Sequence, residues 1–511
     1  MKMMSRWPMA LAELIVLASA GITTQSVHAQ TFTTLYSFCP AANCTDGVQP
    51  HATLIQATNG DLYGTTVGGV ENDIDREFWG TVFKITPDGT LTTLYTFCSE
   101  TGCKDGAGPN GLIEATDGAF YGTTGSFAVN DGAGTVFKFT HNETLTTLYT
   151  FCSQTDCADG EFPSSALIQA ADGNFYGTTA AGGANANGSG DFYGTVFKIA
   201  PGGKLTTLHS FCSQTDCADG REPLGGVVQA TNGNFYGTTL AGGALAAGTV
   251  FQITPGGTLT TLYTFCSQSG CTDGLEPFAG LIQATDGNLY GTTFAGGTEE
   301  NGIVFKITPS GTLTTVYNFC SQSSSSVRCA DGAGPYAGLM QASDGNFYGT
   351  TSGGGANGFG TIFKLTPGGT LTPLYSCSQT ACPDENGAAT GALMQATNGD
   401  LYGTSPEGGH DNMCIYNVYG GCGTIFRLSV GLGAFVETQT TSGSVGAAVK
   451  ILGTDLTRAT SVTFNGTPAT FTVVSRSHIK TTVPTGATTG FVEVVTPRGT
   501  LGSNVVFTVT P

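Results

Sequence analysis

The sequence predicts an all-β fold, and three observations support this prediction. A unit of about 55 residues, marked by Tyr-Gly-Thr-Thr or a near copy, recurs along most of the chain. Of the 511 residues 77 are Gly, 11% are charged and 40% are hydrophobic, which is typical of a turn-rich folded protein and not of a disordered one. Short segments rich in Val, Ile, Thr, Tyr and Phe alternate with Asp-Gly and Pro-Gly turn signals, as β-strands do.

The first 29 residues predict a signal peptide, cleaved after Ala29. Lys2 and Arg6 precede the apolar segment Met9–Gly21, and Val27-His28-Ala29 forms a small-residue cleavage site. No later segment approaches the roughly 20 apolar residues that span a bilayer. We therefore expect an exported protein that has no transmembrane segment after cleavage. The net charge of −19 and the lack of a Lys/Arg run argue against a nucleic-acid partner.

Each repeat predicts four short antiparallel strands. In the unit Ala279–Cys320, "GLIQA" and "NLYGTT" flank Asp286-Gly287, a pair that tolerates the positive φ of a tight hairpin. "IVFKIT" and "LTTVYNF" flank a second tight turn at Pro309-Ser310-Gly311. The marker begins seven times, at Tyr63, Tyr121, Tyr176, Tyr236, Tyr290, Tyr348 and Tyr402.

These units predict a seven-bladed β-propeller over residues 30–431. In Leu259–Phe265, Leu262 breaks the alternation, so both sheet faces carry apolar residues and need cover, which stacking around an axis provides. The last unit finishes at Gly423–Val430 without an outer strand, and Thr31–Phe38 supplies the matching segment, so we expect the N-terminal strand to close the last blade. Residues 432–511 have six or seven short strand patterns and predict a small immunoglobulin-like β-sandwich.

Both regions resemble known families. The recurring "LIQATDGNFYGTT…GG…GTVFKITPGGTLTTLYTF" resembles the GloVer-type (Gloeo_Verruco) tandem repeat of exported bacterial proteins over residues 31–430. "VGAAVKILGTDL", "SVTFNGTPAT" and "VPTGATTGFVEVVTPRGT" resemble an IPT/TIG domain. The resemblance implies a bacterial protein that is secreted or held at the cell surface or in the periplasm. It implies no activity for the repeats, and a spacer or adhesion role for the IPT/TIG domain.

The cysteines predict disulfides. All 16 follow the signal peptide, in eight neighbouring pairs, and export favours oxidation. Tetrahedral zinc needs two such pairs brought together, which separate blades prevent, and the spacing is not the C-x-x-C of redox sites. We expect no metal site and no cofactor. The predicted pairs are Cys39–Cys44, Cys98–Cys103, Cys152–Cys157, Cys212–Cys217, Cys266–Cys271, Cys320–Cys329, Cys377–Cys382 and Cys414–Cys422.

An Asp follows each of the first seven cysteine pairs. We interpret it as a turn residue that directs the chain toward the next blade. The alternative is a ring of carboxylates that attracts cations or basic partners, although one Asp per blade cannot provide the six to eight oxygens that calcium needs. The residues concerned are Asp46, Asp105, Asp159, Asp219, Asp273, Asp331 and Asp384.

The candidate binding residues lie where the repeats differ. Between the Tyr-Gly-Thr-Thr marker and the next strand the loops have 13, 9, 14, 8, 8, 8 and 17 residues, and the first and seventh become neighbours on closure. Both combine aromatic and acidic residues that suit a sugar, although packing over the blade seam would explain the aromatics equally. The candidates are Asp73, Asp75, Phe78, Trp79, His410, Asp411, Tyr416 and Tyr419.

The sequence thus predicts a binding, adhesion or envelope-scaffold protein, a monomer whose ligand is a carbohydrate or another surface protein. We expect no enzymatic activity, because no nucleophile–His–acid arrangement stands out. The rival hypothesis is an extracellular polysaccharide-acting enzyme with loop carboxylates as acid and base.

Overall fold

The computed structural model describes residues 30–40, 44–68, 79–125, 132–186, 192–323, 327, 329–378, 392–409 and 421–510. These residues form antiparallel sheets joined by turns and loops, so the all-β prediction is confirmed. Their helical turns are four three-residue 3-10 turns, η1 (Thr155–Cys157), η2 (Thr215–Cys217), η3 (Ser269–Cys271) and η4 (Leu456–Arg458).

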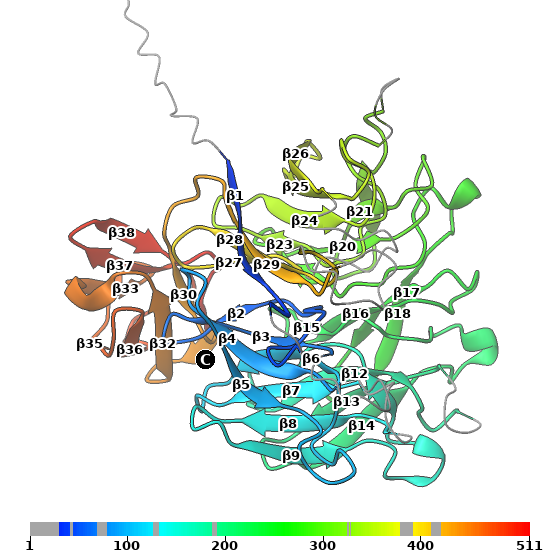
Figure 1. Ribbon diagram of the computed structural model, residues 1–511, viewed down its shortest axis with the longest axis horizontal. Helices are drawn as coiled ribbons and strands as arrows, with labels where there is room; N and C mark the ends of the chain where they lie inside the picture. Colours follow the sequence, from blue (N-terminus) through cyan, green and yellow to red (C-terminus); the bar gives the residue numbers. More distant parts are fainter. Residues whose placement is uncertain are drawn as a thin grey trace, which may run out of the picture.

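The repeats form successive sheets of the same plan (Figure 1). Sheet 1 contains β2 (Ile55–Gln56), β3 (Leu62–Thr66), β4 (Thr81–Ile85) and β5 (Leu91–Thr96). Sheet 2 contains β6 (Pro109–Glu114), β7 (Phe120–Thr124), β8 (Thr135–Phe139) and β9 (Leu145–Thr150). Sheet 3 contains β10 (Glu161–Pro163), β11 (Ile168–Gln169), β12 (Phe175–Ala181), β13 (Thr195–Ile199) and β14 (Leu205–Ser210). Sheet 4 contains β15 (Val228–Gln229), β16 (Phe235–Thr239), β17 (Thr249–Ile253) and β18 (Leu259–Thr264).

The later repeats follow this plan. Sheet 5 contains β19 (Ile282–Gln283), β20 (Leu289–Thr293), β21 (Ile303–Ile307) and β22 (Leu313–Asn318). Sheet 6 contains β23 (Met340–Gln341), β24 (Phe347–Thr351), β25 (Thr361–Leu365) and β26 (Leu371–Ser376). Sheet 7 contains β27 (Met394–Gln395), β28 (Leu401–Ser405), β29 (Thr424–Ser429) and, from the N-terminus, β1 (Thr31–Ser37). In Figure 1 the short strands β2, β15 and β23 lie near the middle of the sheets, whereas β9, β14, β18 and β26 lie at the periphery.

The first half of the Tyr-Gly-Thr-Thr marker holds each sheet together. In sheet 3 the Tyr176 hydroxyl donates to Asp172 in the hairpin turn (2.9 Å), and so fixes the turn to the second strand. Gly177 faces Phe197 on the paired strand, where a Cβ would lie 2.7 Å from the ring. A residue larger than glycine would therefore displace this buried ring.

The second half of the marker connects the sheet to its surroundings. Thr178 Oγ1 donates to the Gly225 carbonyl of the next repeat (3.2 Å). Thr179 Oγ1 bonds to Thr195 Oγ1 of the same sheet (2.9 Å) and accepts the Thr195 backbone N–H (3.1 Å). Each threonine thus satisfies a buried polar group, which is costly to leave unpaired.

The break in alternation at Leu262 has a structural cause. Val250 pairs with Tyr263 and Phe251 pairs with Thr261, so Leu262 is the extra residue of a β-bulge. Leu262 still packs against the core between sheets 4 and 5. The apolar residue on the apparently wrong face is therefore accommodated by a local change of register.

Neighbouring sheets pack through separate cores. Aromatic and aliphatic side chains fill a buried cluster between each sheet and the next, from sheets 1 and 2 to sheets 6 and 7. A further cluster joins sheet 7 to sheet 1 through Tyr402, Ile425, Leu54 and Phe83. Strand β1 pairs antiparallel with β29 from Thr31 to Ser37, as predicted for the N-terminal segment.

A ring of hydrogen bonds also links the innermost strands. In six sheets a glutamine of the innermost strand accepts a backbone N–H from the preceding sheet, and Glu114 does so in sheet 2. Gln229, for example, accepts the Ala171 N–H (2.9 Å) and donates to Gly233 in its own turn (3.2 Å). Within the described residues the donor–acceptor pairs are Thr58–Glu114, Thr116–Gln169, Ala171–Gln229, Thr231–Gln283, Thr285–Gln341, Ser343–Gln395 and Thr397–Gln56. The last bond connects two residues that are 341 positions apart in the sequence.

The C-terminal region forms a separate β-sandwich. Val436, Ile451, Phe464 and Val494 lie in a core of its own, between a sheet of order β30-β32-β36-β35 and a sheet of order β34-β33-β37-β38. The strands are β30 (Val436–Thr438), β31 (Ser442–Ser444), β32 (Ala448–Gly453), β33 (Ser461–Phe464), β34 (Thr467–Pro468), β35 (Phe471–Val473), β36 (His478–Thr482), β37 (Val492–Thr496), β38 (Gly499–Gly502) and β39 (Thr508–Thr510).

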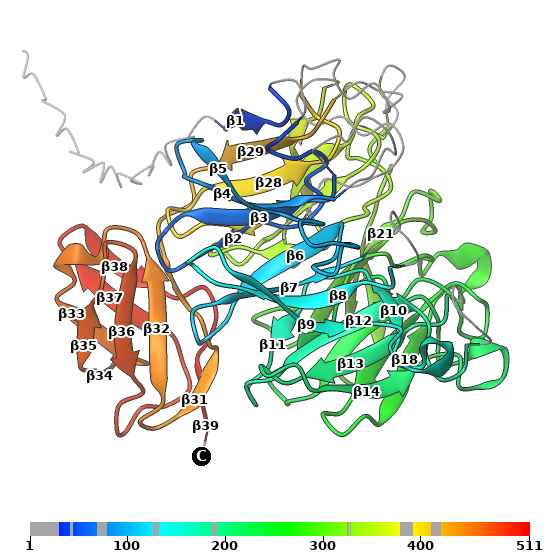
Figure 2. The ribbon, with the colours of Figure 1, turned by 60° about the horizontal axis from the view of Figure 1, so that its bottom comes forward.

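This sandwich contacts the tight turns of the repeats (Figure 2). Ser477 Oγ donates to the Thr58 carbonyl (2.8 Å), and Gln439 donates to Glu114 (3.0 Å). The Phe435 N–H donates to Thr397 (3.1 Å). In antiparallel four-stranded sheets the tight turns share one end and the long loops share the other. The sandwich therefore contacts the turn-bearing end at sheets 1, 2 and 7, and these contacts do not involve the loop-bearing end.

Candidate functional site

The cysteine loops connect one sheet to the next and contain disulfides. Six of the predicted pairs are bonded, from Cys39–Cys44 to Cys320–Cys329. Cys377 and Cys422 are also in disulfides, whereas their predicted partners Cys382 and Cys414 lie outside the described residues. Disulfides on this scale fit a protein exported to an oxidising compartment.

The Asp of five cysteine loops is a buried structural acceptor, whereas Asp46 is half-buried and Asp384 lies outside the described residues. Asp273 has no exposed surface and accepts the Tyr263 hydroxyl (2.8 Å), the Ser267 N–H (2.8 Å) and the Ser267 hydroxyl (2.7 Å). Burial, together with the equivalent bond to Asp105, raises the pKa of the corresponding Tyr95 to about 12. The Asp is therefore a turn residue that also accepts a hydrogen bond from the outer strand. In the described loops these carboxylates are enclosed, which argues against the alternative of a cation-attracting ring.

Repeat 3 varies this arrangement with a histidine. His209 replaces the usual tyrosine of the outer strand, and its Nε2 lies 3.0 Å from Oδ2 of Asp219. Burial alone would raise the pKa of the Asp219 carboxyl, but hydrogen bonds from His209 and Ser213 hold that pKa below its ordinary value. The contact joins the outer strand to the loop and is one more structural bond.

The loop-bearing end presents positions that differ between repeats, and we call the surface that they form the opening. One such position follows the proline of each described cysteine loop, and is occupied by His51, Asn110, Ser164, Leu224, Phe278 and Tyr336. Three of these positions contact the next repeat in sequence. The Asn110 amide donates to the Pro163 carbonyl, and the Ser164 hydroxyl donates to the Leu224 carbonyl (3.0 Å). Phe278 stacks on Tyr336 with ring centroids 4.4 Å apart.

Aromatic side chains concentrate on one sector of this opening. Phe294, the residue after the marker in repeat 5, contacts Phe278 edge-on at 5.5 Å and Tyr336 at 6.2 Å. All three rings are half-buried. We call Phe278, Phe294 and Tyr336 the aromatic sector. Such rings present both apolar faces and, in tyrosine, a polar hydroxyl.

Titratable groups of the opening have shifted pKa values. Surrounding protein lowers the pKa of His51 to about 4, although the side chain keeps contact with solvent, so the imidazole is neutral at pH 7. Burial raises the pKa of Glu222 despite the Arg221 guanidinium 3.1 Å away. The opening therefore offers neutral and acidic hydrogen-bonding groups beside aromatic rings.

Seven of the eight predicted binding residues lie outside the described residues: Asp73, Asp75, Phe78, His410, Asp411, Tyr416 and Tyr419. Trp79 is described, is half-buried, and its carbonyl accepts the Gly108 N–H (3.0 Å). Sequence reasoning missed the aromatic sector. The signal was a constant proline followed by a changing residue in each repeat.

The described residues contain no group of free cysteine thiolates that could bind a metal ion. Two groups of potential ligands lie close together, Cys39, Cys44 and Cys422, and Cys152, Cys157 and Glu161. Every cysteine of both groups is in a disulfide. Since thiolate is the metal-binding form of cysteine, these groups are not metal sites. Within the described part of the chain there is also no helix long and apolar enough to cross a membrane.

Solved structures are similar to this chain at low sequence identity. A fungal alcohol oxidase of the AA5 family, solved in complex with copper, is 12% identical with a TM-score of 0.53, over 95% of this chain and 100% of the oxidase. PorZ, a surface component of the type-IX secretion system of Porphyromonas gingivalis, is 14% identical with a TM-score of 0.45. That match covers 88% of this chain and 58% of PorZ. The likeness to the oxidase shows the fold and says nothing of its chemistry here.

The family comparison agrees with the resemblance read from the repeats. A search of curated protein sequences found no significant match. The model of the Gloeobacter/Verrucomicrobia repeat matches residues 20–218, 186–330 and 322–467, and the IPT/TIG domain model matches residues 436–509. The chain belongs to the Gloeobacter/Verrucomicrobia repeat family and carries an IPT/TIG domain.

Proposed function

We propose that sheets 1 to 7 are the blades of a seven-bladed β-propeller over residues 30–431, followed by the immunoglobulin-like domain of residues 432–511. Three features support this arrangement: sheets of one plan, four-stranded except for an added strand in sheet 3, a buried core between each sheet and the next, and the contacts of sheet 7 with sheet 1. Strand β1 then acts as the outer strand of the last blade. Closure in this way removes most free sheet edges.

We infer that the protein is exported and associated with the bacterial surface, where it binds a ligand without transforming it. The signal-peptide pattern of residues 1–29 and the disulfides support export. The IPT/TIG domain supports a surface location. Because this domain contacts the turn-bearing end of sheets 1, 2 and 7, it does not block the opposite opening to large ligands.

The observation that carries the binding proposal is the contrast between constant and changing positions. The turns, glycines and threonines that hold the sheets together recur, whereas the opening has a different residue in each repeat. Phe278, Phe294 and Tyr336 bring three aromatic rings to that opening. Aromatic faces beside hydrogen-bonding groups suit a carbohydrate ligand. Loops 67–79 and 406–422 belong to adjoining sheets and would extend the same site.

A glycan array on purified residues 30–511, run beside reducing-sugar release assays, tests this function. We expect saturable binding of at least one glycan class without release of reducing ends. Phe278→Ala should weaken that binding at least tenfold, whereas Phe491→Ala, on an exposed aromatic of the IPT/TIG domain, should leave it unchanged. Turnover that disappears on changing Asp73, Asp75 or Asp411 would instead support a polysaccharide-acting enzyme.

A further inference from the structure

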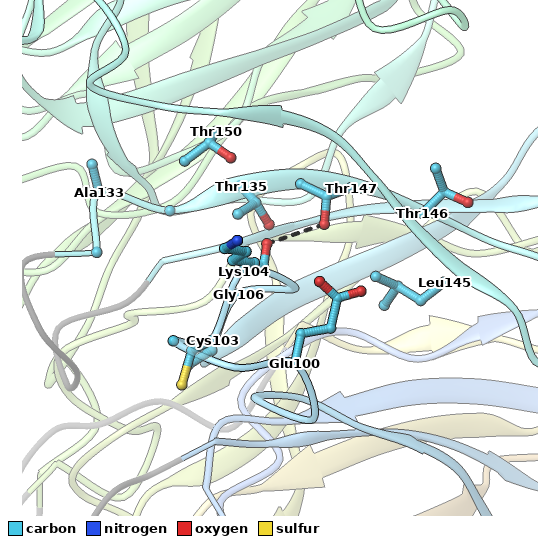
Figure 3. Close-up of a pocket in the computed structure, with 14 residues that line it drawn as sticks. Glu100, Cys103, Lys104, Gly106, Ala133, Thr135, Leu145, Thr146, Thr147 and Thr150 are labelled. Carbon is cyan, nitrogen blue, oxygen red and sulfur yellow. Dashed lines mark hydrogen bonds between the residues drawn. The ribbon is translucent and has the colours of Figure 1, made fainter.

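A cavity of about 710 Å³ lies beside sheet 2, between the loop of the Cys98–Cys103 disulfide and strand β9 (Figure 3). Thr147 Oγ1 on its strand side donates to the Lys104 carbonyl (3.2 Å), and its described walls contain no aromatic ring. Residues 126–131, which precede wall residue Gly132 in the sequence, lie outside the described residues, so these walls do not delimit a ligand site. Described rings that can stack on a ligand lie instead at the opening.

A second set of positions borders the opening. The residue before the proline of each described cysteine loop has a φ between 55° and 60°. Its N–H donates to the preceding repeat, as Glu276 donates to the Ala247 carbonyl (3.1 Å), and the Glu276 carbonyl accepts the Phe294 N–H (3.0 Å). The backbone at this pre-proline position is therefore held on both sides. The residues at the position are Gln49, Gly108, Phe162, Glu222, Glu276 and Gly334.

The two glycines at the pre-proline position show where a side chain begins. A Cβ on Gly334 would lie 3.0 Å from the Phe294 ring of repeat 5 and 3.0 Å from Ser352 Oγ of its own repeat. A Cβ on Gly108 would lie 3.7 Å from the Val67 side chain of repeat 1 and 3.8 Å from a carbonyl oxygen of its own repeat. In both cases the neighbours are the residues that follow the Tyr-Gly-Thr-Thr marker. A side chain at this position thus starts between the marker-following residue of the preceding repeat and that of its own.

The pre-proline position is occupied by glutamate in repeats 4 and 5. By the same geometry Glu276 starts between Leu240 and Phe294, beside the aromatic sector, and Glu222 starts on the other side of Leu240. Both glutamates are half-buried. A positive φ strains any residue with a side chain, whereas the glycines of repeats 2 and 6 adopt it freely. Such strain at a surface of changing residues favours a functional role for the two carboxylates.

The two carboxylates differ in their charge compensation. Arg221 Nη1 lies 3.1 Å from Glu222, but the counterpart of Arg221 in repeat 5 is Leu275. The Glu276 carboxylate has no hydrogen bond or ion pair with the described residues. None of the described pre-proline, post-proline or marker-following residues is Lys or Arg, and His51 among them is neutral at pH 7. A half-buried carboxylate beside an aromatic ring attracts a ligand cation.

We infer that the opening binds a polysaccharide of hexosamine units whose amino groups are not acetylated. This inference rests on the carbohydrate-binding function proposed above and names the class of sugar. The sugar rings stack on the aromatic sector, and a ligand ammonium group donates to the Glu276 carboxylate. A hydrogen bond between two ionised groups is stronger than the bond that a neutral acetamide can offer. The net charge of −19 also attracts a polycation and repels an acidic polysaccharide.

Isothermal titration calorimetry of the mature chain, residues 30–511, tests the inference. The ligands are a glucosamine hexamer, an N-acetylglucosamine hexamer and hexalysine, in a buffer in which the glucosamine amino groups are protonated. We expect the glucosamine hexamer to bind at least about tenfold more tightly than either of the others. Equal or tighter binding of the acetylated hexamer, or no binding of either hexamer while another glycan of the array binds, would overturn the inference and leave the carbohydrate-binding function standing. Tighter binding of hexalysine would overturn it in favour of a basic peptide.

Three variants separate the carboxylate from the ring. Glu276→Gln should weaken binding of the glucosamine hexamer about tenfold and leave the acetylated hexamer unchanged, whereas Phe294→Leu should weaken both. Glu143→Gln should change neither, since Glu143 is also a glutamate of positive φ (60°) but is exposed in a tight turn of sheet 2. Thermal unfolding checks that all three variants fold. An undiminished preference for the glucosamine hexamer in folded Glu276→Gln, or equal weakening of both hexamers, would contradict the role of this carboxylate.

Discussion

The cysteine loop Cys212–Gly220 contains two aspartates with opposite surroundings, and this contrast gives a sharp prediction. Asp219 has no exposed surface, whereas Asp216 is exposed and has a φ of 56°. Asparagine is isosteric with aspartate and tolerates that positive φ. Asp219→Asn should therefore destabilise the loop, and Asp216→Asn should have almost no effect.

The magnitude follows from the hydrogen bonds of Asp219. Its Oδ2 accepts from His209 Nε2 (3.0 Å), the Ser213 N–H (3.1 Å) and the Ser213 hydroxyl (2.7 Å). Its Oδ1 accepts the Gln214 N–H (3.3 Å). A bond to an ionised acceptor contributes roughly 2 kcal/mol and a neutral one roughly 1 kcal/mol, so three weakened bonds cost about 3 kcal/mol. The new amide group would also face the Gln214 N–H, a donor against a donor.

Hydrogen exchange of the Ser213 and Gln214 amides measures this effect. A loss of about 3 kcal/mol should raise the local opening constant about a hundredfold in Asp219→Asn. The disulfide Cys212–Cys217 remains in both variants and limits the opening to the loop. Equal exchange in the two variants would refute the structural role of the buried carboxylate.

Three further predictions concern the rest of the scaffold. Glu114→Ala should loosen the IPT/TIG domain, because it removes the oxygen that accepts both the Thr58 N–H and the Gln439 amide; proteolysis near residue 432 should become faster. Deleting residues 30–38 should remove the strand that pairs with β29, lowering the melting temperature and broadening the transition. The pKa of Asp172 is lowered to about 2, since hydrogen bonds, the first of them from Lys198, outweigh burial. Its stabilisation is present above about pH 4 and is lost as pH falls toward 2, so Asp172→Asn should flatten acid unfolding followed by circular dichroism.

Most of the fold could be predicted from local sequence patterns within each repeat. Asp-Gly and Pro-Gly pairs marked the turns that the sheets have, and the incomplete last unit predicted that β1 pairs with β29. Strand lengths were harder to predict from the sequence. "GLIQA" pairs over Ile282–Gln283 alone, because the neighbouring Gly280 lies against Gly226 of the adjacent repeat. Crowding between repeats is a tertiary effect that no single unit encodes.

The candidate site was predicted less well, for a physical reason. Residues 67–79 and 406–422 were selected because their loops are long. The described aromatic sector instead comes from positions at which the residue type changes between repeats while the loop length stays the same. Phe278 and Tyr336 belong to different repeats and meet only when adjacent sheets pack.

The most direct test of ligand binding at the loop-bearing opening is hydrogen–deuterium exchange with and without a glycan that binds in the array. We expect slower exchange at residues 48–52, 276–279, 294–295 and 333–337, which surround the opening. We expect no change at the tight turns or in the IPT/TIG domain. Protection confined to the turn-bearing end or to residues 436–509 would contradict the proposed location of the binding site.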